Sequence, residues 1–194
     1  FIPGPVEVHP DVLDAQARWM YGHRMPECAD LVERIEPKLK AVFQTERPVL
    51  ISASSGTGLW EGASRNCVRS RVLHCVNSAF SERWAEVSAL NGKTVEVLAT
   101  EPGRAIKPDE VGKALAGGSF DALAIVHNET SAGVLNPLAD IARAVRALPG
   151  GDEIVILVDA VSGVSGVDIL PDAWDLDVVL TSSQKAFALP PGLS

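Results

Sequence analysis

Residues 154–160, "IVILVDA", form an unbroken apolar and largely β-branched run that ends in an aspartate. A run without polar alternation is typical of a strand whose sheet is covered on both faces. Similar runs recur along the chain, at "PVLISAS" (48–54), "RVLHCVN" (71–77), "TVEVLA" (94–99), "ALAIVHN" (122–128) and "DVVLTSS" (177–183). Helical patterns separate most of them, at residues 58–68, 81–90, 108–116 and 138–148. This alternation predicts an α/β fold with a mostly parallel sheet and helices on both faces.

Composition limits the classes of partner. The chain has 194 residues, 46% of them hydrophobic, and a formal net charge of −8. No basic block is present, so we expect no nucleic-acid partner. The apolar runs are shorter than the roughly 20 residues that a membrane span needs, and "FIPGPVEVHP" lacks the apolar core of a signal peptide. Three cysteines without metal-ligand spacing predict a reducing, cytoplasmic location and no metal site.

The first 46 residues differ from the rest. They begin with a Pro/Gly-rich arm and continue with helical patterns at 10–19 and 27–45, the second of which Pro37 is expected to break or kink. We therefore expect an N-terminal arm with helices over residues 1–46 and a ligand-binding domain over residues 47–194.

Ligands of parallel α/β sheets bind at the carboxyl ends of the strands. Small, polar or ionisable residues follow the predicted strands there, in "SSGTG", "NSAF", "HNETSAG", "DAVSG" and "SSQK". The segment "SSGTGLWEG" (54–62) leads into a helix through two glycines, a pattern that binds phosphate through backbone N–H groups. An ordinary tight turn is the alternative. A dinucleotide site is a weaker one, because Gly62 comes one position late and no acidic residue follows "CVNS".

Two ionisable residues end neighbouring strands. Asp159 follows a fully apolar run, so it either caps a turn or meets a buried cation. Lys185 lies in "TSSQKAFALPPG" (181–192), a nearly uncharged stretch, whereas most lysines are surface charges. A desolvated amine is a nucleophile that can form a Schiff base. The Ser-x-x-Lys pattern of serine acyl-enzymes is present at 182–185, but its companion motifs are absent from the sequence.

An aromatic residue completes the set. Phe80 follows the strand at 71–77 and could cover a planar ligand, while the tryptophans are interpreted as packing residues. A phosphate turn, an aromatic ring, a buried carboxylate and a desolvated lysine are the groups that pyridoxal 5′-phosphate (PLP) requires.

The chain resembles the class V aminotransferases of PLP fold type I, most closely the alanine–glyoxylate and serine–pyruvate group. The resemblance spans essentially the whole sequence and rests on "IPGPVEVHPDVL", "YGHRMPE", "SASSGTGLWEGA", "NSAFSERWAE", "HNETSAGVLNPL", "ILVDAVSGVSG" and "TSSQKAFALPPGLS". It implies the fold type I large domain, with a C-terminal small domain and its substrate-binding arginine outside this sequence.

The resemblance also implies the site. Lys185 is similar to the catalytic Schiff-base lysine, and Asp159 to the partner of the pyridine nitrogen. The remaining cofactor-binding positions are Thr57, Gly58 and Leu59 in the phosphate turn, Phe80 and Val161 on the two sides of the ring, Thr130 near the phenolic oxygen, and Gln184. Gly4 is similar to a substrate-binding position, and "GHR" (22–24) to a segment near the partner's site in a homodimer.

The implied activity is transfer of an amino group from a small amino acid, alanine or serine, to glyoxylate or pyruvate. A class V lyase would use the same cofactor, but those enzymes usually carry histidine where this chain has Gln184, which disfavours that activity. Two further functions stay open, a catalytically silent cofactor-binding fragment and a nucleotide-binding oxidoreductase.

Overall fold

A computed structural model describes residues 4–194. The elements follow in the order α1 (Pro10–Gln16), α2 (Pro26–Phe43), α3 (Gly56–Cys67), β1 (Arg71–Val76), α4 (Ala79–Leu90), β2 (Thr94–Ala99), α5 (Pro108–Ala116), β3 (Ala122–Val126), β4 (Asn128–Glu129), β5 (Val134–Leu135), α6 (Leu138–Arg146), a 3₁₀ turn (Gly151–Glu153), β6 (Val155–Asp159) and β7 (Val178–Leu180). No helix in this range is both long enough and apolar enough to cross a membrane.

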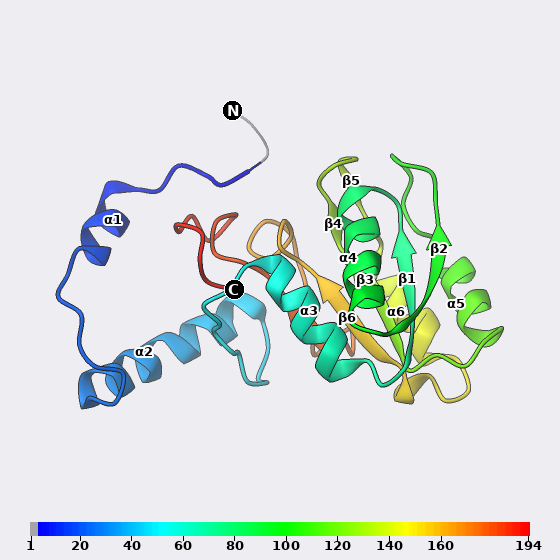
Figure 1. Cartoon of the computed structure of the whole chain (residues 1–194), viewed down its shortest axis with the longest axis horizontal. Helices are drawn as coiled ribbons and strands as arrows, with labels where there is room; N and C mark the ends of the chain where they lie inside the picture. Colours follow the sequence, from blue (N-terminus) through cyan, green and yellow to red (C-terminus); the bar gives the residue numbers. More distant parts are fainter. Residues whose placement is uncertain (1–3) are drawn as a thin grey trace.

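Five parallel strands form the central sheet in the order β2-β1-β3-β6-β7. Helices α3 and α4 cover one face, and α5 and α6 cover the other (Figure 1). Strand β1 shows why, because its buried side chains alternate: Leu73 and Cys75 join the core with α5 and α6, whereas Val72 joins the core with α3 and α4. The predicted parallel α/β fold is confirmed.

Helix α6 illustrates how the sequence forms these layers. Its buried residues Leu138, Ile141, Ala142 and Val145 recur at the spacing of one helix face, and they pack against the sheet. The opposite face is charged and solvated, with an Arg143–Asp140 ion pair of 2.7 Å.

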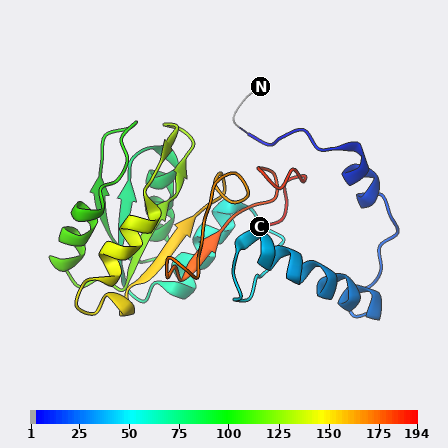
Figure 2. The same ribbon diagram turned by 180° about the vertical axis from the view of Figure 1, so that it is seen from behind.

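Helices α1 and α2 lie outside these layers and extend to one side of the sheet (Figures 1 and 2). The C-terminal end of α2 is anchored by Phe43, whose ring centroid lies 6.2 Å from that of Phe187. Of the two outcomes expected at Pro37, a break or a kink, the break does not occur, since α2 runs from Pro26 to Phe43. Both Pro37 and Glu33, whose carbonyl loses its N–H donor, are exposed, so water can replace the missing hydrogen bond.

The strand predicted at residues 48–54 is absent from the structure as described. The segment is extended, and Ser52 exchanges two backbone hydrogen bonds with Ser194, at 2.7 and 2.9 Å. Leu50 is 86% exposed, so the apolar run does not form the buried strand that its sequence suggests. An apolar, β-branched segment becomes a strand only where neighbouring backbone is available to pair with it.

Arg146 forms a polar cluster at the amino ends of β6 and β7. Its guanidinium donates to the carbonyl oxygens of Gly151 and Ile154, at 2.8 and 2.7 Å, and to the Asp177 carboxylate at 2.7 Å. Asp177 also accepts from the backbone N–H of Ile156, and Asp175 forms a 2.9 Å ion pair with Arg146. Helix α6, β6 and β7 are therefore joined at the edge of the sheet opposite to the carboxyl ends of the strands.

Candidate active site

A cavity of about 220 Å³ opens at the carboxyl ends of β3 and β6 and beside the loop that follows β7. Most of the predicted site residues line it, namely Thr57, Phe80, Thr130, Asp159, Val161, Gln184 and Lys185. The strand register explains this gathering, because Val126 pairs with Asp159 and Asp159 pairs with Leu180. Three neighbouring parallel strands therefore end at the same level, and the residues after them share one edge.

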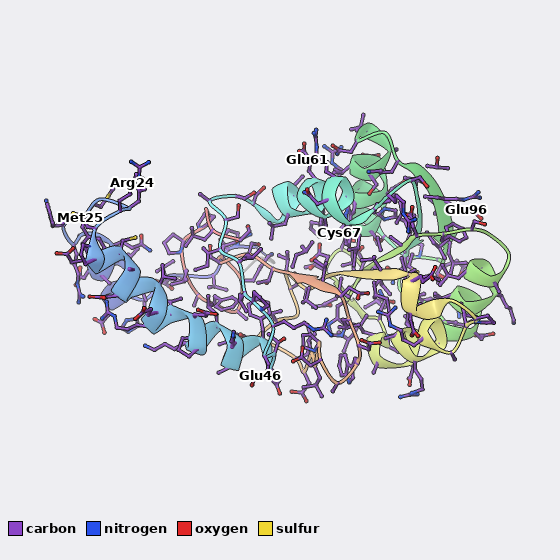
Figure 3. The ribbon with its side chains drawn as sticks, turned by 90° about the horizontal axis from the view of Figure 1, so that it is seen from below. Arg24, Met25, Glu46, Glu61, Cys67 and Glu96 are labelled. Atoms are coloured by element: carbon purple, nitrogen blue, oxygen red, sulfur yellow. The ribbon has the colours of Figure 1, made fainter. Side chains whose placement is uncertain are left out.

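Three predicted residues lie outside the lining. Gly58 faces inward, where its backbone N–H donates to the Ser55 hydroxyl at 3.2 Å, and Leu59 borders a different, apolar cavity. Gly4 lies in the arm, which reaches the site at the backbone hydrogen bond from Val6 to the carbonyl of Gln184, at 3.1 Å. Arg24 of the "GHR" segment lies at the outer end of the molecule, opposite to Glu96 (Figure 3).

Helix α3 begins at the cavity. Ser55 is its N-cap, and the cap leaves Gly56 and Thr57 in the first turn, against the cavity wall. The first N–H groups of a helix have no acceptor within the helix, and the helix dipole makes this end attractive to an anion. A methyl group on Gly56 would lie 3.0 Å from the Val161 side chain, so a larger residue there would require the β6 loop to shift by a few tenths of an ångström.

Asp159 is buried at the floor of the cavity, with 4% of its surface exposed. One carboxylate oxygen accepts from the backbone N–H of Val161 at 2.8 Å, and the other accepts from the indole N–H of Trp60 at 2.6 Å. Burial raises the pKa of Asp159 to about 6. The two hydrogen bonds and the charge of Lys185 favour the ionised form and act to lower the pKa. The two N–H donors and the Lys185 charge therefore partly offset the cost of burying this carboxylate.

Lys185 is half-buried in the loop that follows β7. The loop folds back on itself through hydrogen bonds from Ala188 N–H to the Lys185 carbonyl, at 2.9 Å, and from Leu189 N–H to the Ser183 carbonyl, at 3.1 Å. The lysine is thus carried on a closed loop at the edge of the cavity, where its amine can meet a ligand carbonyl.

A second buried carboxylate supports the opposite wall. Glu129 is fully buried and accepts from the backbone N–H and hydroxyl of Ser81, both at 2.9 Å, and from the Ser131 hydroxyl at 2.6 Å. Burial acts to raise its pKa, but the hydrogen bonds from Ser131 and Ser81 outweigh it and hold the pKa below its ordinary value. Glu129 thereby joins the start of α4, which carries Phe80, to the β4–β5 hairpin, which carries Thr130.

Three of the residues that line the cavity were given no individual role from the sequence. Trp60, Ser162 and Ser182 line the cavity, and Thr130 and Ser162 hydroxyl oxygens lie 2.7 Å apart. The signal for Ser162 and Ser182 was their position after predicted strands. Trp60 lies on a helix turn, and its sequence carries no sign of its hydrogen bond to Asp159.

The donors at the cavity fit a phosphorylated aromatic aldehyde. The Ser182 hydroxyl is buried and has no hydrogen-bond partner among residues 4–194, and it lies 3.7 Å from the point where a Gly56 side chain would start. An unpaired buried hydroxyl beside a helix N-terminus suits an anion. No group of three or more His, Cys, Asp or Glu side chains in the described range is arranged to hold a metal ion.

Comparison with known proteins places this geometry in a family. The family model for aminotransferase class-V matches residues 14–194. The chain is 36% identical along its whole length to a Synechococcus protein named soluble hydrogenase, small subunit, spanning 51% of that protein. It is 32% identical along its whole length to the L-aspartate–glyoxylate aminotransferase of Paracoccus denitrificans, spanning 50% of it.

Solved structures agree with the sequence match. An alanine–glyoxylate aminotransferase from Nostoc superposes on 98% of this chain with a TM-score of 0.92 and 32% identity, and the chain spans 50% of that structure. The chain thus spans about half the length of the relatives it matches, and its fold is that of the fold type I aminotransferases. Because the family model matches residues 14–194, which is nearly the whole sequence, this chain belongs to the class-V aminotransferase family.

Proposed function

We propose that the protein containing this chain is a PLP-dependent aminotransferase, which moves an amino group from a small amino acid, alanine or serine, to glyoxylate or pyruvate. The observation that carries the proposal is the meeting of Lys185, Asp159 and the start of α3 around one cavity. The named glyoxylate aminotransferases among the relatives support the substrate class.

Different residues of the cavity would bind different parts of such a cofactor. The first N–H groups of α3, with Thr57 and Ser182, would hold the phosphate. Phe80 and Val161 would enclose the ring from its two sides, and Thr130 would contact the phenolic oxygen. Gly58 and Leu59 would act through the backbone turn that they form rather than by lining the cavity.

The two ionisable residues, Asp159 and Lys185, would hold and transfer protons. When bound, PLP supplies a cationic pyridine ring that withdraws electrons from the substrate α-carbon. Asp159 would hold the proton on the ring nitrogen, and its buried carboxylate is favoured in that role because a cation nearby offsets the cost of its charge. The Lys185 amine would take the proton from the substrate α-carbon and return it, while Gln184 fixes the loop beside it.

The arm supports a homodimer with active sites near the interface. Large apolar side chains are exposed on it, with Trp19 at 79%, Met20 at 85% and Val32 at 52% exposure. Apolar side chains gathered on one projecting segment mark a protein interface. Gly4 and residues 22–24 would then act at the partner's site or at the substrate end of the cavity.

We also propose the division into residues 1–46 and 47–194, and a cytoplasmic location, in which the free cysteines Cys28, Cys67 and Cys75 stay reduced.

Absorbance tests the proposal directly. Full-length protein mixed with PLP is expected to gain an absorbance band in the violet from the PLP–lysine imine, which Lys185→Ala abolishes. Lys113→Ala is the matched control, since Lys113 is an exposed lysine on α5 paired with Asp109. A wild-type protein without the band, or a band that survives Lys185→Ala, would contradict the proposal. A panel of amino donors against glyoxylate and pyruvate then identifies the substrates.

A further inference from the structure

Trp60 connects the core between the helices to the floor of the cavity. Its side chain is 4% exposed, and its indole N–H donates to Oδ2 of Asp159 at 2.6 Å. The other oxygen, Oδ1, accepts from Val161 N–H at 2.8 Å. Each carboxylate oxygen therefore has one N–H donor supplied by the protein, one from α3 and one from the β6 loop.

The indole is itself held from behind. Trp60 stacks on Trp84 of α4, with ring centroids 6.0 Å apart and planes at 13°. The edge of His74 from β1 contacts Trp84, at 5.6 Å and 80°. A chain of buried hydrogen bonds runs from His74 Nε2 to the Ser88 hydroxyl at 2.9 Å, on to the Ser64 hydroxyl at 2.8 Å, and from there to the carbonyl of Trp60 at 2.7 Å. Trp60 thus has little freedom to turn.

A carboxylate on a short side chain rotates easily about its terminal bond. Two N–H donors from different elements remove that freedom and direct the remaining lone pairs toward the cavity. Hydrogen bonds to the ionised form also favour that form over the neutral acid. Charge-assisted bonds of this kind are the stronger ones in proteins.

We propose that Trp60 is a positioning residue: its indole N–H fixes the plane of the Asp159 carboxylate and keeps it ionised, so that it can hold a proton on the cofactor ring. This rests on the proposed function, because it assigns Asp159 to the ring nitrogen. It gives Trp60 a role that packing does not require, since Trp84 packs in the same stack and its indole nitrogen has no partner among the described residues.

Three more ionisable groups surround Asp159. Lys185 lines the same cavity, and its charge favours the ionised carboxylate, whereas the charge of the buried Glu129 of β4 disfavours it. His127 lies directly after β3, beside Asp159 in the sheet, and burial lowers its pKa to about 4, so it is neutral at pH values above that. Removing the Trp60 donor leaves all three in place, which isolates its effect.

The test compares Trp60→Phe with Trp84→Phe in the full-length protein. Asp159 is followed by ¹³C NMR of its carboxyl carbon without cofactor, with Asp159→Asn identifying the signal. Trp60→Phe is expected to raise the titration midpoint by about 0.5 to 1 pH unit and to weaken PLP binding about ten-fold. Trp84→Phe removes a buried indole of the same stack and is expected to leave the midpoint unchanged. An unchanged midpoint in Trp60→Phe, or an equal rise in Trp84→Phe, would overturn the proposal.

A measurement on the wild-type protein covers the case in which Trp60→Phe fails to fold. The indole ¹H–¹⁵N resonance of Trp60, assigned by replacing the other tryptophans one at a time, is expected to shift with pH at the midpoint of Asp159. If the indole resonance does not shift at the pH where Asp159 titrates, the hydrogen bond from Trp60 is not what controls the ionisation of Asp159, and the proposal is overturned. Neither NMR experiment needs cofactor, so a wild-type protein that does not bind PLP would contradict the proposed function and leave this inference to its own result.

Discussion

The Ser183 hydroxyl donates a hydrogen bond to the carbonyl oxygen of Pro190 across 2.7 Å, and this bond closes the loop that carries Lys185. Neither Pro190 nor Pro191 has a backbone N–H, so these two residues can take part in backbone hydrogen bonds only as acceptors. Ser183 is buried, and its backbone N–H also donates to the Leu193 carbonyl at 3.0 Å. One serine therefore holds both ends of the lysine loop.

Ser183→Ala is expected to loosen that loop. The change leaves the Pro190 carbonyl without its donor and should lower the free energy of unfolding by about 1–2 kcal/mol. It should also weaken PLP binding several-fold, because Lys185 is no longer held at the cavity edge. Thermal unfolding and a PLP titration measure the two effects. Ser119→Ala, at an exposed serine, is the control and should change neither; equal losses in both variants would contradict the prediction.

Glu129→Gln is expected to separate the two walls of the cavity. The amide would face the Ser81 and Ser131 donors with an N–H₂ group, at a cost of about 2–3 kcal/mol in unfolding free energy at pH 7. Because the pKa of Glu129 is lowered in the folded state, the wild-type advantage is present above pH 4.5 and disappears as the pH falls below it. Urea unfolding across pH measures this. Glu82→Gln, an exposed residue in the first turn of α4, should have little effect at either pH.

His74 makes the fold sensitive to acid. Burial lowers its pKa from 6.5 to about 4, so the unfolded state binds a proton that the folded state does not. Stability should therefore fall as the pH drops from 6.5 toward 4, by about 3 kcal/mol in total for this residue. His74→Asn should lower stability at pH 7 but flatten the slope between pH 6.5 and 4.5, in urea unfolding. His23→Asn replaces an exposed histidine of the arm and should keep the wild-type slope; an unaltered slope in His74→Asn would contradict the assignment.

Gly58 and Gly62 lie on the same helix, and alanine at the two positions is expected to change the stability by different amounts. A methyl group at Gly58 would overlap the Ser54 hydroxyl, which would have to rotate away and give up its 3.3 Å hydrogen bond to the Ser55 carbonyl, whereas one at Gly62 meets no atom of residues 4–194 within 4 Å. Gly62→Ala should therefore stabilise the protein by about 0.5–1 kcal/mol. Gly58→Ala should give a smaller gain, because the Ser54 side chain has to move, and should weaken PLP binding.

Combining Gly58→Ala with Ser54→Ala tests whether the Ser54 hydroxyl causes this difference. Ser54→Ala removes the hydroxyl that the new methyl would meet, so Gly58→Ala should stabilise the Ser54→Ala protein more than it stabilises the wild type. Melting temperatures of the two single variants and the double variant measure this difference. If Gly58→Ala has the same effect in both backgrounds, the contact with Ser54 is not the reason for its smaller gain.

The sequence predicted the parallel sheet and the edge at which the site residues meet, because apolar runs and strand ends are local features. It did not predict the state of residues 48–54, since strand formation there depends on backbone that lies elsewhere. It also carried no sign of the Trp60–Asp159 contact, because a tryptophan that packs and a tryptophan that donates have the same sequence pattern. The β4–β5 hairpin was missed for a similar reason, since two-residue strands are too short to form a pattern.

The Arg146 cluster lies at the amino ends of β6 and β7, and the cavity lies at the carboxyl end of β6 and beyond β7. The ionic contacts that join the strands and the residues that line the cavity thus lie at opposite ends of the same strands. Substitutions around the cavity can therefore leave intact the ionic cluster by which Arg146 joins α6, β6 and β7.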